Sequence, residues 1–395
     1  MAKTVAVVFG GGHVSSWHAG LYGVVKKAEE TGRKVIGFRD GFVGANNGVY
    51  YELTSKEIEP DRSGVLIGAS RAKVNPAKVK DTLAKLKRSG VNVEAIVGFC
   101  GDDHLKQLHK LWAEEEIPVV GWPKTMDNDI SNTYFALGYP TAAVHAIEAV
   151  RRGYTTAWTY ARCHIISMFG RDTDWVAAAA GGFAPADLVI GGEIDESSVY
   201  TTKYNIDYLL QRIKQIRENN RIRYGRPFAV IAIAEGAKID RLESHLSDYQ
   251  MDVHGHLKIE PEKLVLSLKY ALLEIDKNLD ISTDTLTYDN LRNCSPVEID
   301  KELSIRAGER CIEALDDGQT HACAVISCDR QSGEFSVDLA TLPDVYEKRR
   351  LRAEGFMDYD RLEPTREFLE YYEPLFGKAK THEEILPARP PERVV

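Results

Sequence analysis

The chain has 395 residues, of which 44% are hydrophobic and 28% charged, and its formal net charge is −9. The length exceeds what one hydrophobic core usually fills, which predicts two lobes, and the negative charge argues against nucleic acid or an anionic membrane as the main partner. The six cysteines form no CxxC pair, which favours reduced thiols in a cytoplasmic protein over a disulfide framework or a zinc site.

Short β-branched runs alternate with helical patterns, which predicts an α/β fold with a mostly parallel sheet covered on both faces. The first run begins at Val5 without a charged leader, and no apolar stretch approaches 18 residues, so we expect neither a signal peptide nor a membrane span. The predicted strands are Val5–Phe9, Lys34–Phe38, Val93–Val97, Pro118–Val120, His164–Met168, Pro227–Ala232 and Ala322–Ser327. The predicted helices include Pro76–Arg88, Leu105–Glu115 and Pro140–Arg152.

Two glycine-containing loops follow early in the chain. Gly10–Gly12 comes after the first predicted strand, where free amides can approach an anion, although a plain strand–helix turn explains these residues equally well. The next residues, His13–Ser16, do not complete the G-x-G-x-x-G pattern of dinucleotide-binding proteins, which counts against an oxidoreductase. Gly64–Arg71 ends in an arginine that suits a phosphate, although a surface turn with a solvated arginine is the simpler interpretation.

Two acidic loops, Gly101–Asp103 and Pro123–Ile130, follow consecutive predicted strands. Each is a common turn sequence when taken alone. Because a right-handed strand–helix–strand crossover places both loops at the same carboxyl edge of the sheet, four carboxylates can converge there. Such a site can bring a hydroxyl, a magnesium ion and a phosphate together, which is the chemistry of phosphoryl transfer.

Further basic residues occur later in the chain. Phe169–Arg171 follows the predicted strand His164–Met168, and Arg162 precedes the same strand at its opposite end. The densest basic run, Lys348–Arg352, is typical of a solvated helix face, an interpretation that we favour over an anion site.

We assign no functional site to three other segments. The stretch from Leu242 to Thr285 interrupts the alternation and is read as an insertion or an excursion between lobes. Within it, His254 and His256 have no third ligand nearby, which favours a polar loop over a metal site. The proline-rich end, Pro387–Pro391, predicts an extended tail.

Taken in order, these segments resemble the phosphofructokinase family over about residues 3–330. The resemblance rests on Gly10–Gly12, Gly37–Phe42, Gly64–Arg71, Gly101–Asp103, Pro123–Ile130, Phe169–Arg171, Ala234–Ala237 and Arg292 with Ser295-Pro296. It implies the phosphofructokinase fold, with two similar Rossmann-like lobes and mostly parallel sheets. Residues 1–138 would form the phosphate-donor lobe and residues 139–340 the sugar-binding lobe, with 242–300 crossing between lobes and 341–395 as a C-terminal helical segment with an extended tail.

The resemblance also implies roles for individual residues. Asp127 would take the proton from the attacking sugar hydroxyl, Asp129 would support it, and Asp102 would hold Mg²⁺. The residues that would contact the phosphoryl donor or the transferring phosphoryl group are Gly11, Gly12, Arg71, Asp103, Lys124, Thr125 and Arg171. The sugar and its own phosphate would be held by Arg162, Phe169, Gly170, Glu235 and Arg292. Because the family builds part of that phosphate pocket from a neighbouring subunit, a homodimer or homotetramer is expected.

Two positions indicate the phosphoryl donor. ATP-dependent members carry glycine where this chain has Asp103 and Lys124, and both side chains here are typical of pyrophosphate-dependent members. An aspartate would oppose the α-phosphate with about 4 kcal/mol of repulsion at ~4 Å and an effective dielectric near ~20. Lys124 offers a charge partner to a small anion without base or ribose. The sequence therefore predicts pyrophosphate as donor, with Mg²⁺ as cofactor.

The acceptor is less determined, because Ser15–His18 replace a proline-glycine-x-asparagine pattern and Asp289 stands at the position of a phosphate-pocket histidine. Fructose 6-phosphate, converted reversibly to fructose 1,6-bisphosphate, is the family default. Sedoheptulose 7-phosphate and an unphosphorylated sugar or polyol stay open as acceptors. An ATP-dependent 6-phosphofructokinase and a non-catalytic sugar-phosphate-binding homologue are weaker alternatives, the latter because Asp102, Asp127 and Asp129 are all present.

Overall fold

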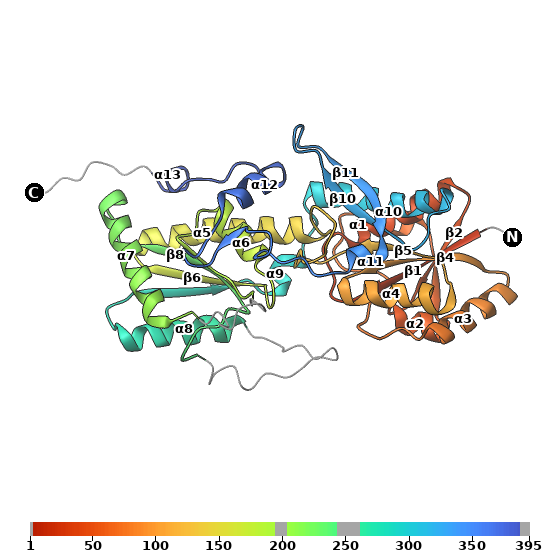
Figure 1. Cartoon of the computed structure of the whole chain (residues 1–395), viewed down its shortest axis with the longest axis horizontal. Helices are drawn as coiled ribbons and strands as arrows, with labels where there is room; N and C mark the ends of the chain where they lie inside the picture. Colours follow the sequence, from red (N-terminus) through yellow and green to blue (C-terminus); the bar gives the residue numbers. More distant parts are fainter. Residues whose placement is uncertain (1–2, 194–203, 243–260, 388–395) are drawn as a thin grey trace, which may run out of the picture. The chain divides into compact units, whose positions relative to one another are not determined.

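The computed structural model describes residues 3–193, 204–242 and 261–387. The chain divides into two compact units (Figure 1): unit 1 comprises residues 1–142 and 289–349, and unit 2 comprises residues 143–288 and 350–395. This division differs from the expected lobes, since residues 289–340 belong with the first part of the chain and not with a lobe spanning 139–340. The interpretations of His254 and His256 and of the tail from residue 388 onward lie outside the described residues.

Unit 1 is built on a seven-stranded sheet with the order β11-β10-β5-β4-β1-β2-β3. Its strands are β1 (Lys3–Gly10), β2 (Lys34–Phe38), β3 (Tyr50–Leu53), β4 (Asn92–Cys100), β5 (Val119–Pro123), β10 (Ala322–Cys328) and β11 (Phe335–Thr341). The five inner strands run parallel, and the edge strands β3 and β11 run antiparallel to their neighbours. The inner strands are apolar almost throughout, because helices cover both faces of the sheet.

The helices of unit 1 are α1 (Trp17–Glu30), α2 (Phe42–Asn47), the 3₁₀ turn η1 (Ser55–Glu57), α3 (Pro76–Arg88), α4 (Asp102–Glu115), α9 (Tyr288–Arg292, which begins at the unit boundary), α10 (Glu298–Asp316) and α11 (Leu342–Val345). Figure 1 shows α2, α3 and α4 on one face of the sheet and α1 with α10 on the other. A Cβ at Gly23 would lie 2.1 Å from the Ile305 carbonyl oxygen, so glycine lets these two helices touch backbone to backbone. This close packing explains why residues after 289 belong to unit 1.

Unit 2 contains a four-stranded, fully parallel sheet with the order β7-β8-β6-β9. Its strands are β6 (Cys163–Met168), β7 (Leu188–Ile190), β8 (Ala229–Ala234) and β9 (Ile281–Thr285), with a small separate pair β12 (Met357–Asp358) and β13 (Glu363–Pro364). Its helices are α5 (Tyr139–Tyr160, which begins in unit 1), α6 (Trp175–Phe183), α7 (Ile206–Tyr224), α8 (Pro261–Ile275), α12 (Arg366–Phe376) and α13 (His382–Ile385). Apolar residues of α7 and α8 pack together on one face of this sheet.

The expected α/β fold with mostly parallel sheets is confirmed, and each of the seven predicted strands is present. The interpretation of Leu242–Thr285 as an insertion is wrong for its described part, because α8 packs on the second sheet and β9 pairs with β6. Among the residues that the structure describes, no helix combines the length and apolarity needed to cross a membrane.

Candidate active site

The two acidic loops lie at the same edge of the unit 1 sheet. Strands β4 and β5 are parallel neighbours with Cys100 opposite Pro123, and the backbone N–H of Lys124 donates to the Cys100 carbonyl at 3.0 Å. Asp102 and Asp103 form the first turn of α4, where the helix dipole favours negative charge. The strand–helix–strand crossover therefore places both loops as the sequence predicts.

Side chains within the second acidic loop fix its shape. The Thr125 hydroxyl accepts a hydrogen bond from the Asp127 N–H at 3.0 Å. Asn128 is fully buried, has φ 55°, and accepts a bond at its Oδ1 from the Ala136 N–H at 2.8 Å. Asparagine tolerates this left-handed conformation, so Asn128 fixes the turn between the two aspartates. Sequence reasoning did not select Asn128, although its place between Asp127 and Asp129 in a turn is a usable signal.

The carboxylates of the two loops lie within electrostatic reach of one another. Burial, followed by the negative charges of Asp127 and Asp102, raises the pKa of Asp129 well above its usual value, and Lys348 opposes this shift. Among the described residues, no three or more His, Cys, Asp or Glu side chains form a metal-binding group. A magnesium ion at Asp102 would therefore take most ligands from phosphate and water, which Mg²⁺ commonly does, and the surplus of negative charge fits a cation.

Lys124 connects the second acidic loop with Gly10–Gly12. Its side chain is buried, its Nζ donates to the Gly12 carbonyl at 2.5 Å, and the ammonium lies 5.2 Å from the centre of the Trp17 ring. Burial lowers the pKa of Lys124 to about 8, and Asp127 acts in the opposite direction. Gly11 has φ 85°, a left-handed conformation that favours glycine, and a Cβ there would lie 3.0 Å from the Lys124 Nζ.

The loop Gly64–Arg71 lies beside the first glycine loop. The Ser70 carbonyl accepts a hydrogen bond from the Gly11 N–H at 3.2 Å. The His18 Nε2 accepts a bond from the Leu66 N–H at 3.0 Å, so one of the residues that depart from the family pattern supports this loop. Arg71 follows Ser70 directly and is thereby carried to the edge at Gly11.

Arg292 also lies against the first glycine loop. Its carbonyl accepts hydrogen bonds from the hydroxyls of Ser15 at 2.9 Å and Ser63 at 2.8 Å. Its Nη1 lies 3.0 Å from the position that a Cβ of Gly12 would occupy. The structure therefore brings Arg292 together with residues expected for the donor, whereas the resemblance assigned it to the phosphate of the sugar.

His13 and Asn293 are further side chains at this loop that the sequence did not single out. The Nε2 of His13 is hydrogen-bonded to Oδ1 of Asn293, whose amide donates to Asp289. Burial, and next the charge of Arg292, lower the pKa of His13. Asp289 is therefore hydrogen-bonded to Asn293 beside the first glycine loop. The bond between His13 and Asn293 joins segments 280 positions apart in the sequence.

In unit 2, four of the predicted residues gather at the carboxyl end of β6. The Glu235 N–H donates to the Met168 carbonyl at 2.9 Å, and the Gly236 N–H donates to the Gly170 carbonyl at 3.0 Å. Burial raises the pKa of Glu235 to about 7, and the charge of Arg171 opposes this. Phe169, Gly170 and Arg171 directly follow β6, and the Phe169 ring packs edge-to-face against Tyr288 with ring centres 5.0 Å apart.

Arg162 lies at the other end of the same strand. It precedes the six-residue β6, whose length corresponds to about 20 Å. Its guanidinium pairs with Asp280 at 3.3 Å and lies 4.5 Å from the centre of the Tyr160 ring. Within unit 2, Arg162 is therefore not brought together with Glu235 and Arg171.

The basic run Lys348–Arg352 does not form the expected helix face. Lys348 forms an antiparallel bridge with Ile130 of the second acidic loop, and the Arg349 N–H donates to the Asp129 carbonyl at 2.8 Å. The helix-face interpretation is wrong, because this backbone pairs with a distant loop and not with itself.

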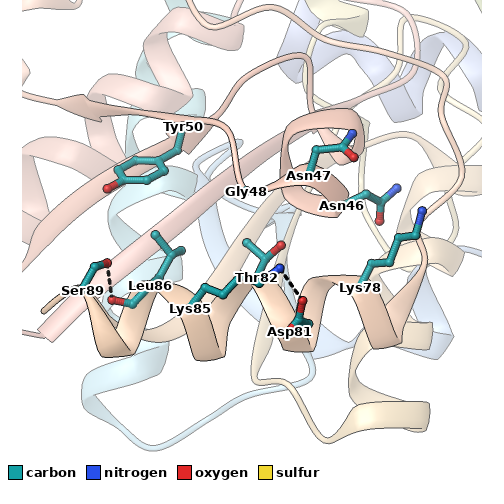
Figure 2. A pocket seen from close by; sticks show the side chains of 10 residues that line it. All are labelled: Asn46, Asn47, Gly48, Tyr50, Lys78, Asp81, Thr82, Lys85, Leu86 and Ser89. Atoms are coloured by element: carbon teal, nitrogen blue, oxygen red, sulfur yellow. Dashed lines mark hydrogen bonds and ion pairs between the residues drawn. The ribbon is translucent and has the colours of Figure 1, made fainter.

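A pocket of about 600 Å³ lies in another part of unit 1, between α2, β3 and α3 (Figure 2). It is lined by Asn46, Asn47, Gly48, Tyr50, Lys78, Asp81, Thr82, Lys85, Leu86 and Ser89. Lys85 is paired with Asp81 at 2.6 Å, and none of the lining residues was predicted from the sequence as a site residue. The predicted residues of unit 1 lie outside this pocket, in loops at the ends of strands. Phosphate sites commonly take this form.

Two curated relatives are similar to most of the chain. A pyrophosphate–fructose 6-phosphate 1-phosphotransferase of Dictyoglomus thermophilum is 27% identical over 322 residues, which cover 80% of this chain and 87% of the relative. An ATP-dependent 6-phosphofructokinase 3 of Streptomyces coelicolor is 29% identical over 321 residues, which cover 80% of this chain and 88% of the relative. Relatives named for pyrophosphate and relatives named for ATP therefore match this chain at similar identity.

Solved structures show the same fold. A pyrophosphate-dependent phosphofructokinase from Marinobacter aquaeolei has a TM-score of 0.77 at 19% identity, covering 96% of this chain and 92% of that one. One from Nitrosospira multiformis has a TM-score of 0.75 at 17% identity, covering 96% and 93%. Residues 4–315 match the family model described as Phosphofructokinase. The chain therefore belongs to the phosphofructokinase family, whose members transfer a phosphoryl group to an alcohol.

Proposed function

We propose that the protein transfers a phosphoryl group from pyrophosphate to a sugar phosphate, with fructose 6-phosphate as the first acceptor to test. The observation that carries the donor assignment is Lys124, whose buried ammonium is bonded to the carbonyl of Gly12 at 2.5 Å. A charge fixed at this loop suits a small, highly charged anion that offers no base or ribose for binding. Asp103, in the first turn of α4, adds negative charge that disfavours a nucleotide with a third phosphate.

The proposed chemistry needs positioning and charge neutralisation more than covalent steps. Asp127 would accept the proton of the attacking hydroxyl, with Asp129 beside it, and the Thr125 hydroxyl would orient Asp127 through its N–H, which it binds at 3.0 Å. Arg71 and Arg171 would neutralise the transferring group. Mg²⁺, when bound at Asp102, would supply further neutralisation of the donor phosphates.

The proposed acceptor residues are Phe169, Gly170 and Glu235 in unit 2. Arg162 and Arg292 are proposed for the phosphate of the sugar; for Arg292 this assignment comes from the resemblance, since within unit 1 its guanidinium lies at Gly12 of the first glycine loop. Because burial raises the pKa of Glu235 to about 7, this side chain can donate or accept a hydrogen bond to a sugar hydroxyl near neutral pH. Arg162 and Glu235 lie at opposite ends of β6, which supports Arg162 serving a neighbouring subunit in a homodimer or homotetramer. Sedoheptulose 7-phosphate and unphosphorylated sugars or polyols remain alternative acceptors.

The test measures initial rates of the purified protein with pyrophosphate–Mg²⁺ and ATP–Mg²⁺ side by side. The acceptors are fructose 6-phosphate, sedoheptulose 7-phosphate, and the unphosphorylated sugars and polyols. We expect transfer from pyrophosphate and none of comparable rate from ATP. Equal rates from the two donors would overturn the donor assignment, and a faster unphosphorylated acceptor would overturn the sugar-phosphate assignment.

A double variant sharpens the donor test. Asp103→Gly with Lys124→Gly should raise the ratio of ATP to pyrophosphate rates by about tenfold or more, since both changes remove charges that distinguish the donors. The matched control is Asp81→Asn with Lys85→Met, which removes an exposed acid–lysine pair of α3 with a separation of 2.6 Å. The control should leave the ratio unchanged.

A further inference from the structure

Residues 125–137 form a segment that turns back on itself and contains most of the second acidic loop. The Thr125 N–H donates to the Leu137 carbonyl at 3.1 Å, and the Ala136 N–H donates to the Asn128 Oδ1 at 2.8 Å. These bonds close the segment at its base. Residues 129–134 lie between the closing bonds and are fixed by contacts with other parts of unit 1.

Strand β10 holds one side of this segment. The Tyr134 N–H donates to the Ile326 carbonyl at 2.7 Å, and the Ile326 N–H donates to the Thr133 hydroxyl at 3.0 Å. Thr133 and Tyr134 are both buried. Because buried backbone carbonyls need a donor from within the protein, the carbonyl groups of these two residues also require partners.

Arg349 supplies these partners and joins the two sides of the segment. Its Nη1 donates to the carbonyls of Thr133 and Tyr134, each at 3.1 Å, while its backbone N–H donates to the Asp129 carbonyl at 2.8 Å. Hydrogen bonds from a charged group such as guanidinium are roughly twice as strong as those between neutral groups. The half-buried Arg349 therefore fixes the backbone at Asp129 relative to residues 133–134.

The position of Arg349 is itself built into the fold. The N–H and the hydroxyl of Ser131 both donate to the Glu347 carbonyl, at 3.0 and 2.8 Å. The preceding helix α11 contributes the fully buried Leu342 and Val345 to the core of unit 1. Glu347 and Arg349 lie beyond residues 4–315, the range that matches the family model, so this hold on the acidic loop comes from outside the matched region.

We propose that Arg349 is a positioning residue of the phosphoryl-transfer site, which holds the carboxylates of Asp127 and Asp129 in place through the backbone that carries them. The inference rests on the proposed role of Asp127 as the base, and it is independent of the identity of the donor. A displacement of about 1 Å at a reacting group can cost about 100-fold in rate. Loss of Arg349 therefore slows the chemical step more than it weakens substrate binding.

The first test removes the guanidinium. Arg349→Met should lower kcat by about tenfold with KM for donor and acceptor changed less than about twofold, because the closing bonds and β10 still hold the rest of the segment. Arg349→Lys keeps the charge and can donate to one of the two carbonyls, so its kcat should lie between those of wild type and Arg349→Met. Arg366→Met is the control: it removes an exposed arginine paired with Glu370 on α12 at 2.6 Å and should leave kcat unchanged.

The second test asks whether Arg349 acts through Asp127. Adding Arg349→Met to Asp127→Asn should lower kcat by less than about twofold more, because the positioned group no longer accepts a proton. A purely structural role would lower kcat by the same factor in both backgrounds, and that result would overturn the proposal. Urea unfolding identifies a variant that does not fold, and Arg349→Lys then replaces Arg349→Met in the comparison.

Three other results would also overturn the proposal. They are a normal kcat in Arg349→Met, a kcat of Arg349→Lys no higher than that of Arg349→Met, and a raised donor KM at normal kcat, which would mean direct contact with phosphate. Near-normal kcat in Asp127→Asn alone would instead remove the assignment of the base. The assay uses whichever donor the wild-type protein accepts, so a preference for ATP would overturn the donor assignment and leave this test intact.

Discussion

Buried or half-buried acids with raised pKa values occur in both units, and the surroundings of Asp129 in unit 1 differ from those of Asp174 and Glu193 in unit 2. In unit 2, the Asp174 carboxylate accepts hydrogen bonds from the N–H groups of Gly192 and Glu193 and from the Tyr359 hydroxyl, the last at 2.7 Å. The Glu193 carboxylate accepts bonds from the N–H groups of Leu351 and Arg352, each at 2.9 Å. In unit 1, Asp129 has two further carboxylates, Asp127 and Asp102, among the groups that act on its pKa.

We infer from this difference that Asp174 and Glu193 stabilise the fold, whereas Asp127 and Asp129 serve the chemistry of the site. Burial raises the pKa of Asp174, and burial and Asp174 together raise that of Glu193 to about 7, yet each carboxylate is held by several neutral donors. These bonds fasten the segment from Leu351 onward to the rest of unit 2. Charges that repel each other, as at Asp127 and Asp129, do not stabilise a fold, so we expect them to be retained for their reactivity.

The largest expected effect tests the chemical side of this comparison. Asp127→Asn should lower kcat by at least about 100-fold, because the proposed base can no longer accept a proton. Its free energy of unfolding should be unchanged or higher, because a repelling charge is removed. Steady-state rates and urea unfolding measure the two quantities, with Asp81→Asn as the exposed control. Near-normal kcat would remove Asp127 from the base role.

The structural side is tested by Asp174→Ala. This change leaves the N–H groups of Gly192 and Glu193 and the Tyr359 hydroxyl without their acceptor in a buried place, so the free energy of unfolding should fall by about 2 kcal/mol. Asp172→Ala, at an exposed carboxylate two residues earlier, should change it by less than about 0.5 kcal/mol. Equal urea midpoints for wild type and Asp174→Ala would contradict the assignment of a structural role.

Features that depend on residues close together in the sequence could be predicted, and features that depend on residues far apart in the sequence could not. The acidic edge could be predicted, because β4, α4 and β5 are consecutive and their crossover has a fixed hand. Strands β3, β7, β9 and β11 were missed, since β7 has only three residues and β3 and β11 are half-exposed antiparallel edges. These short or edge strands lack the apolar runs that marked the others.

The candidate site shows the same limit. The residues of the acidic loops and of the turn at Phe169–Arg171 were found because they follow apolar strands directly. The pairing of Lys348 with Ile130 joins residues more than 200 positions apart, and the contact of Arg292 with Gly12 joins residues 280 apart. No local pattern specifies such pairings, so the basic run was interpreted as a solvated helix face in preference to an anion site. His18 and Asn128 act through hydrogen bonds that composition does not reveal.

The smallest expected effect concerns Asp129 and depends on pH. Because its pKa is raised in the folded protein, the folded state holds the proton more tightly than the unfolded chain does. The stability of the wild type should therefore fall as pH rises from the ordinary aspartate pKa, about 4, towards the raised value. Asparagine cannot ionise, so Asp129→Asn should be more stable by about 1 kcal/mol at neutral pH.

The pH dependence of this difference distinguishes it from an ordinary packing effect. The gap in unfolding free energy between Asp129→Asn and wild type should widen from pH 5 towards pH 8 in urea titrations, because only the wild type acquires an additional repelling charge. Asp338→Asn, at an exposed position of β11, should show no such widening. A gap that stayed constant or narrowed would mean that the carboxylates of unit 1 are compensated as fully as those of unit 2. The contrast between structural and chemical acids would then be lost, even if Asp127→Asn had proved inactive.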